Sequence, residues 1–147
     1  MLVREAHVED INQLLDIEHY CYDDPWPREA FEEEIGNGIA GIGMVAEDDG
    51  IIVGFITGLT MAQELQVHNI AVHPDYQGRG IGRQLMEAVD ALGRAGDYKR
   101  ISLEVRQDND IACKLYMSLG FKAVGARKDF YGPGQDASLY TKELTAE

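Results

Sequence analysis

The chain has 147 residues and a mass of 16.3 kDa, which is the size of a single domain, and we expect one domain over residues 1–147. It carries 26 acidic and 13 basic residues, for a formal net charge of −13. This charge argues against binding to nucleic acid, which requires a basic surface for the phosphates, and against attachment to an anionic membrane.

The acidic residues are concentrated in the first third of the chain. Residues 1–50 contain 14 acidic and two basic residues, for a net charge of −12, whereas residues 51–147 are nearly neutral. Such an asymmetry fits an acidic face that meets a cationic partner, and it equally fits a solvated surface that keeps the protein soluble. Both interpretations remain open at this level.

Cysteine usage and hydropathy indicate a cytoplasmic protein. Cys21 and Cys113 lie far apart and form no Cys-x-x-Cys pair, so we expect neither a disulfide framework nor a metal site. The start of the chain lacks the basic and then apolar pattern of a signal peptide, and no apolar stretch reaches the length of a membrane span. We expect a monomer or a weak homodimer.

Hydrophobic periodicity predicts alternating strands and helices, that is, an α/β or α+β domain. The glycine-rich stretch with Gly36, Gly38, Gly41 and Gly43 is expected to be a loop. The predicted strands span residues 1–6, 44–47, 51–59, 65–72, 100–106, 121–126 and 137–144. A first helix is predicted to begin near residue 8, and three further helices are predicted at residues 28–35, 82–92 and 109–119.

The last of these helices has the clearest end signals. Asn109 can cap its first turn, and Gly120 can end it. Ile111, Leu115 and Leu119 recur every four residues and predict the face that packs against the core.

A glycine-rich loop between a predicted strand and a predicted helix is the strongest chemical signal. Glycines let the backbone approach a ligand closely, and the N-terminus of a helix attracts phosphate, so this loop predicts a phosphate or pyrophosphate site. The loop consists of Gln77, Gly78, Arg79, Gly80, Ile81, Gly82 and Arg83.

Three phosphate loops can be compared with it. A P-loop ends in Gly-Lys-Ser/Thr, and this loop contains no lysine; a dinucleotide fingerprint requires a glycine where Arg83 stands. The coenzyme A loop, Gln/Arg-x-x-Gly-x-Gly/Ala, is matched by Gln77, Gly80 and Gly82. The remaining alternative is a tight turn that binds nothing.

With these motifs, the chain resembles the GNAT N-acetyltransferase superfamily over nearly its whole length. The loop carries the superfamily pattern, preceded by residues 69–76 and followed by residues 102–106 and 115–121. The segment Leu-Glu-Val-Arg, together with Asn109 and the pair Pro25-Trp26, points to the branch that acetylates protein N-termini.

The resemblance implies a mixed, mostly antiparallel central sheet with helices on both faces. The sheet would open between the strands at 66–72 and 100–106, and acetyl-CoA would lie in the wedge. The implied contacts are pantetheine pairing with the backbone of Ile70, Ala71 and Val72, pyrophosphate binding by the loop from Gln77 to Arg83, and a further contact to pantetheine from Asn109.

Glu104 is the first candidate catalytic residue. It shares one face of its strand with Ser102 and Arg106. This face could be exposed to solvent, with or without an ion pair between Glu104 and Arg106, or Glu104 could face the open wedge. The resemblance implies that it is the general base, because an amine acceptor is mostly protonated at neutral pH and must lose a proton before it attacks.

Tyr116 is the second candidate, and as a helical aromatic residue it could equally be a core residue. The resemblance implies that it is the general acid. Because a thiol (pKa about 8.5) is more acidic than a phenol (pKa about 10), a hydrogen bond to the departing sulfur would be enough. The N–H of Val72 is expected, by analogy, to stabilise the thioester oxygen.

The acceptor is less well defined by the sequence. Trp26, His68 and Tyr131 are candidate acceptor-binding residues, and Phe130 stands where the family carries a first tyrosine before Tyr131. The resemblance implies direct transfer in a ternary complex to the N-terminal amine of a protein, such as the basic tail of a ribosomal protein. The alternatives are a small-molecule amine, a lysine side chain, and a non-catalytic acyl-CoA-binding module.

Overall fold

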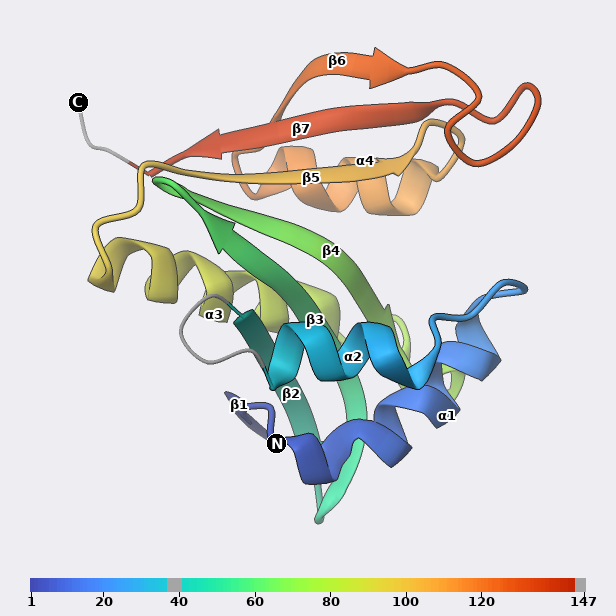
Figure 1. The fold of residues 1–147 in the computed structure, drawn as a ribbon, viewed down its shortest axis with the longest axis vertical. Coiled ribbons are helices and arrows are strands. Elements are labelled where there is room, and N and C mark those ends of the chain that lie inside the picture. Colours follow the sequence, from blue (N-terminus) through green and yellow to red (C-terminus); the bar gives the residue numbers. More distant parts are fainter. Residues whose placement is uncertain (37–40, 145–147) are drawn as a thin grey trace.

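The computed structural model describes residues 1–36 and 41–144, which form a seven-stranded sheet in the order β1-β2-β3-β4-β5-β7-β6 (Figure 1). All strand pairs are antiparallel except β4–β5. The strands are β1 (Leu2–Glu5), β2 (Gly41–Asp48), β3 (Ile51–Met61), β4 (Glu64–Val72), β5 (Arg100–Arg106), β6 (Lys122–Arg127) and β7 (Ala137–Glu143). The helices are α1 (Ile11–Cys21), α2 (Arg28–Ile35), α3 (Ile81–Ala95) and α4 (Asp110–Ser118), with short 3-10 turns at Val8–Asp10 and Pro74–Tyr76.

Helices cover both faces of the sheet, and each face has its own apolar core. Leu14 of α1 and Phe31 of α2 are fully buried on one face. On the other face, Leu85 of α3 and Tyr116 of α4 pack in one cluster with Ile101 of β5. The mixed, mostly antiparallel sheet with helices on both faces confirms the expected fold class. No helix within the described ranges is long and apolar enough to span a membrane.

The sheet opens between β4 and β5. These two strands pair in parallel only from Glu64 to Val67 and from Arg100 to Leu103. Beyond that point β4 curves away while β5 continues along β7, so the two strands diverge (Figure 1). The opening lies between the two strands where the family resemblance implied it.

A bulge in β4 marks the start of this divergence. Thr57 of β3 pairs with Asn69, but Gly58 pairs with Val67, so His68 is an extra residue in β4. A bulge, in which two residues of one strand lie opposite a single residue of the partner strand, bends the strand locally. A Cβ atom on Gly58 would lie 1.9 Å from a backbone oxygen of β4, so this position requires glycine.

The glycine-rich stretch before β2 was wrongly expected to be entirely loop. Gly36 follows the last residue of α2, whereas Gly41 and Gly43 lie within β2, and Gly38 is outside the described residues. A Cβ atom on Gly41 would lie 1.9 Å from the carbonyl oxygen of Glu34. The glycine therefore allows the strand to pass close to the end of α2.

The expected inner face of α4 was partly wrong. Leu115 and Leu119 do pack against the core, but Ile111 is 85% exposed. Tyr116, only 4% exposed, is the most buried residue of the inner face. Ile111 lies five residues away from it, about 140° around the helix, and therefore points outward.

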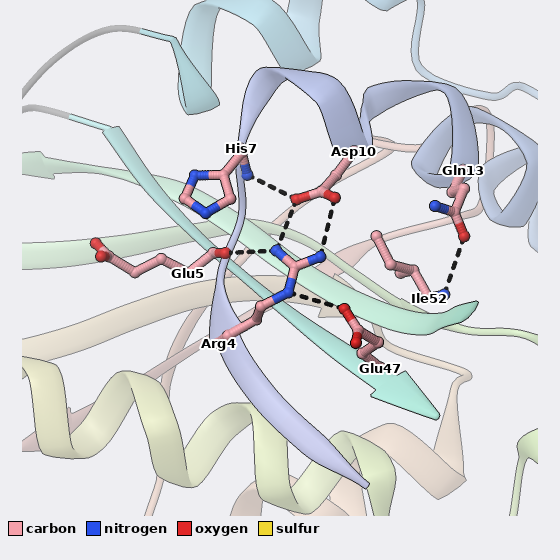
Figure 2. Close-up of polar contacts among 7 residues, drawn as sticks. All are labelled: Arg4, Glu5, His7, Asp10, Gln13, Glu47 and Ile52. Carbon is pink, nitrogen blue, oxygen red and sulfur yellow. Dashed lines mark hydrogen bonds and ion pairs between the residues drawn. The ribbon is translucent and has the colours of Figure 1, made fainter. Parts of the chain in front are cut away.

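Arg4 joins the N-terminal strand to two other elements (Figure 2). Its guanidinium donates two hydrogen bonds, of 2.9 and 3.0 Å, to the carboxylate of Asp10 and one of 2.9 Å to Glu47 of β2. Asp10 also accepts a 2.7 Å hydrogen bond from the backbone N–H of His7. The hydrogen bonds from Arg4 lower the pKa of Asp10 below its ordinary value, although burial opposes this effect.

We expect Arg4→Met to lower the free energy of unfolding by about 2 kcal/mol, because it leaves a buried carboxylate without its cation. Since the pKa of Asp10 is lowered in the folded state, this contribution is present above pH about 4 and is lost as the pH falls further. Urea unfolding of both proteins from pH 7 to pH 3 measures it.

Lys114→Met is the matched control, because Lys114 is exposed on α4, and its loss should change stability by less than about 0.5 kcal/mol. Equal losses for the two variants at pH 7 would show that the contacts of Arg4 add nothing to stability.

Candidate active site

The diverging strands enclose a cleft with a volume of about 810 Å³. Seven residues that the sequence singled out line it together, although they come from six separate segments of the chain. These residues are Trp26, His68, Ile70, Glu104, Asn109, Tyr116 and Tyr131. The cleft therefore joins the candidate catalytic pair to the candidate acceptor residues and to the predicted pantetheine strand.

The backbone of β4 presents an edge to this cleft. The N–H of His73 donates a hydrogen bond to the carbonyl of Val53 in β3. Ala71 lies two residues earlier and is paired with Phe55, so its N–H and C=O groups also point toward β3. Because bonded residues alternate in an antiparallel pair, the N–H and C=O groups of Ile70 and Val72 point away from β3. Of the three predicted backbone contacts, Ile70 and Val72 thus face the opening and Ala71 does not.

The carbonyls on this edge accept hydrogen bonds from side chains. The hydroxyl of Tyr22 donates to the carbonyl of Ile70 at 2.7 Å. The carbonyl of Val72 accepts from Gln77 Nε2 at 3.0 Å and from the thiol of Cys21 at 3.2 Å. Gln77, the first residue of the predicted coenzyme A loop, is thereby tied to the end of β4.

The glycine loop leads from β4 into α3, outside the lining of the cleft. Gly78 and Gly80 have φ angles of +79° and +80°, a conformation that favours glycine. The α-helix begins at Ile81, so the N–H groups of Ile81, Gly82 and Arg83 belong to a first turn that has no intrahelical partners for them. This arrangement suits an anion.

The two arginines of the loop are held by neighbouring residues. The Arg79 guanidinium lies 5.0 Å from the centre of the Tyr76 ring, and Arg83 donates a 2.7 Å hydrogen bond to Ser118 of α4. Both add positive charge beside the helix N-terminus. The donors and charges of this segment fit a pyrophosphate group.

Asn109 lines the cleft opposite β4 and caps α4. Its Oδ1 accepts a 3.2 Å hydrogen bond from the backbone N–H of Ala112, which confirms the predicted cap. The amide nitrogen of the same side chain remains a donor suited to a carbonyl of a pantetheine arm.

Glu104 lies on β5 with its side chain 26% exposed. Its carboxylate forms an ion pair of 3.3 Å with Arg127 of β6, not with Arg106. Arg106 instead donates to Gln135 at 2.6 Å and lies 4.8 Å from the centre of the Tyr131 ring. The alternative of a Glu104–Arg106 pair is therefore wrong.

Tyr116 is buried behind the cleft wall. Its ring contacts those of Phe121 and Tyr140, with centres 5.8 and 6.2 Å away. Burial raises the pKa of Tyr116 to about 12, so its hydroxyl remains protonated at every pH at which the protein works. Tyr116 thus belongs to the core and also lines the cleft.

Trp26, His68 and Tyr131 also line a second groove of about 580 Å³, together with Glu104. A substrate chain in this groove would reach Glu104 from the opposite side to the glycine loop. The indole of Trp26 packs on Phe31 with ring centres 5.3 Å apart, so it is held by the core of α2.

His68 is held by a buried carboxylate. Its Nδ1 forms an ion pair with Glu34 of α2, and this hydrogen bond raises the pKa of the imidazole above its ordinary value, although burial opposes it. The sequence singled out His68 but missed Glu34. Nothing in the run of three glutamates on α2 distinguishes the one that points inward.

Three residues at the end of α1 line the cleft and were not predicted as site residues. Glu18, Cys21 and Tyr22 line the cleft beside the aspartates of the following loop. Glu18 could have been found, because it continues the buried helical stripe of Leu14 and Ile17 with a carboxylate.

Acidic side chains outnumber basic ones along the cleft. Glu18, Asp23, Asp24 and Glu104 line it, against one arginine and His68. This lining favours a cationic group near Glu104. Within the described part of the chain, no cluster of three or more His, Cys, Asp or Glu side chains is placed to hold a metal ion.

The fold and this cleft define an acyltransferase. The acetyltransferase (GNAT) family matches residues 9–121 of the chain, and the chain therefore belongs to this family. It is an acetyl-CoA-dependent N-acetyltransferase.

Several relatives that resemble the chain belong to one branch of that family. The N-alpha-acetyltransferase RimI of Mycobacterium tuberculosis is 41% identical over 124 residues, which cover 80% of this chain and 74% of the relative. The ribosomal protein bS18-alanine N-acetyltransferase of Escherichia coli K12 is 32% identical over 130 residues, covering 88% and 86%. The crystal structure of the Escherichia coli ribosomal-protein-S18-alanine N-acetyltransferase superposes with a TM-score of 0.91 at 26% identity, covering 99% and 95%.

We expect the imidazole of His68 to titrate above pH 6.5, the ordinary value for histidine, in an NMR experiment on the folded protein. Glu34→Gln should lower the midpoint, because it removes the negative partner. The pair stabilises the fold fully below pH about 6.5, and this contribution is lost as the pH rises through the raised pKa.

Glu33→Gln is the control, because Glu33 is the exposed neighbour of Glu34 and should leave the midpoint unchanged. A midpoint that responds equally to both variants would contradict the role of the ion pair.

Proposed function

We propose that the protein transfers the acetyl group of acetyl-CoA to the N-terminal α-amine of a protein, by direct attack in a ternary complex. The single observation that carries the proposal is that Glu104 and Tyr116 line one cleft beside the edge of β4. The name of the Escherichia coli relative supports a ribosomal protein as the acceptor, and with such an acceptor the reaction would take place in the cytoplasm.

The residues present fit acetyl-CoA. The open edge at Ile70 and Val72 suits the amides of pantetheine, Asn109 suits a carbonyl of the same arm, and the turn from Gly78 to Arg83 suits the pyrophosphate. When bound, acetyl-CoA supplies the acetyl group as a thioester.

Glu104 would take a proton from the acceptor. An α-ammonium group titrates near pH 8 and must become an amine before it can attack, so a carboxylate at the cleft is needed as base. Arg127 lies 3.3 Å from this carboxylate and helps to fix its position. The proton moves to a carboxylate oxygen of Glu104, directly or through a water.

Tyr116 and Val72 would stabilise the charge that develops during transfer. The hydroxyl of Tyr116 stays protonated because burial raises its pKa to about 12, so it donates a hydrogen bond toward the departing sulfur. The N–H of Val72 points to the open side of β4 and suits the thioester oxygen.

An acetyl-enzyme is not required. Cys21 lines the cleft, but burial raises the pKa of its thiol, and its hydrogen donates to the carbonyl of Val72. A protonated, hydrogen-bonded thiol is a poor nucleophile. This supports direct attack by the acceptor amine.

The acidic lining supports a basic acceptor tail. Asp23 and Asp24 lie on the loop after α1, at the cleft, and Glu18 and Glu104 lie deeper in it. Attraction between such carboxylates and a cationic peptide weakens as salt screens exposed charges.

The deciding experiment is thiol release from acetyl-CoA with a panel of acceptors. We expect turnover on peptides with a free N-terminus, and a KM for a basic peptide that rises with ionic strength while that for a neutral peptide does not. The same basic peptide with a blocked N-terminus should be inactive.

Turnover on lysine peptides or polyamines alone would replace the proposal by one of those activities. Binding of acetyl-CoA without turnover on any amine would indicate a binding module. A KM independent of salt would show that the acidic lining is only a solvated surface.

We expect Glu104→Gln to lower kcat by at least about 100-fold, because an amide cannot accept the proton. Tyr116→Phe should lower kcat by about 10-fold or more, because the hydrogen bond to the sulfur is lost. Rapid-quench measurements of a single turnover report the chemical step.

Glu143→Gln and Tyr20→Phe are the matched controls, since both residues are exposed and lie outside the lining of the cleft. An unchanged chemical step in Glu104→Gln or Tyr116→Phe would remove the role assigned to that residue.

A further inference from the structure

Glu18 is a buried carboxylate that the proposed chemistry does not use. It lies in the last turn of α1, is only 1% exposed, and belongs to the wall of the cleft. A charged side chain is almost never fully buried unless it is paired or hydrogen-bonded. Its presence on the inner face of the helix therefore needs a reason.

Both oxygens of Glu18 have a partner, and the two partners come from different parts of the chain. Oε2 accepts a 2.8 Å hydrogen bond from the backbone N–H of Trp26, and Oε1 accepts one of 2.8 Å from Nδ2 of Asn69. Burial raises the pKa of this carboxyl, while the two donors oppose the shift by favouring the charged form. Loss of Glu18 would leave two donors without a partner.

These partners mark two sides of the acceptor entrance. Trp26 lies on the connection between α1 and α2, and its side chain lines both the cleft and the second groove. Asn69 is 8% exposed and directly follows His68, the bulge residue of β4. Glu18 thus joins the segment between α1 and α2, which contains Trp26, to β4, the strand that diverges from β5.

The neighbouring turn of α1 is fixed to the same strand. Cys21 and Tyr22 donate to the carbonyls of Val72 and Ile70. The end of α1 is therefore held along β4 at three points, and only the contact from Glu18 extends to Trp26.

We propose that Glu18 is a positioning residue of the acceptor site, which fixes Trp26 relative to β4 so that the acceptor amine meets Glu104. This inference rests on the proposed function. Glu18 acts through Trp26 and Asn69, so its loss misplaces the acceptor without removing the base. The loss therefore weakens the binding of the acceptor, and the acceptor KM reports it.

The first test compares Glu18→Leu with Glu18→Gln. Leucine removes both hydrogen bonds, and we expect the KM for the acceptor peptide to rise about tenfold or more. Glutamine keeps an oxygen for Trp26 N–H, and its amide nitrogen can donate to Asn69 if that side chain turns its oxygen inward. The KM of Glu18→Gln should therefore stay within about threefold of the wild-type value.

The Kd for acetyl-CoA, measured by calorimetry without acceptor, should be unchanged in both variants. A purely structural defect would lower the fraction of active enzyme, and hence the apparent kcat, but would leave the acceptor KM unchanged. Asp16→Asn is the matched control, because it removes one negative charge from the exposed face of the same helix.

The second test reverses the donor and the acceptor. Asn69→Asp sets a carboxylate against that of Glu18, and we expect the acceptor KM to rise about tenfold. Adding Glu18→Gln restores an amide–carboxylate pair in the opposite direction, and the KM should return to within about threefold of that of Glu18→Gln alone.

If Glu18→Leu does not fold, the second test still decides the question, because Asn69→Asp and Glu18→Gln are both polar substitutions. Acceptor KM values equal to wild type in Glu18→Leu and Asn69→Asp, or additive losses in the double variant, would overturn the inference. Wild-type protein without activity on any free N-terminus would overturn the proposed function instead, before the variants are compared.

Discussion

The pairing of β4 with β5 over four residues only is the constraint on which the rest of the structure depends. Backbone groups on an open strand edge must find other partners. In this protein Tyr22, Cys21 and Gln77 satisfy the carbonyls of Ile70 and Val72. The opening thus creates a cleft and, at the same time, draws the end of α1 and the start of the glycine loop to its rim.

The acidic first third of the chain has two distinct roles. Asp10, Glu18 and Glu34 are buried, and each bonds a specific partner: Arg4, the Trp26–Asn69 pair and His68, respectively. Asp23 and Asp24 instead line the cleft. The net charge of −12 in residues 1–50 is therefore neither uniformly a solvated surface nor uniformly an acceptor-facing one.

Sequence reasoning succeeded where a local pattern has a local cause. The turn at Gly80 and the cap at Asn109 follow from short segments whose geometry is set by their own residues. It failed for Gly41, which pairs with Leu59 of β3 and passes close to Glu34, and for Ile111, because burial of Tyr116 sets the rotation of α4. Both failures arose from contacts between segments distant in the chain.

The sequence by itself determined the alternation of strands and helices and the glycine loop, because motifs and periodicity are local properties. The opening between two strands and the candidate roles of Glu104 and Tyr116 were implied by the family resemblance. Only the tertiary structure decided which carboxylates are buried and with what they pair. Glu104 forms an ion pair with Arg127 on β6 rather than with Arg106, two residues along the same strand, and Glu18 joins Trp26 to Asn69. Such pairs form across separate elements, and packing alone brings their atoms within hydrogen-bond distance.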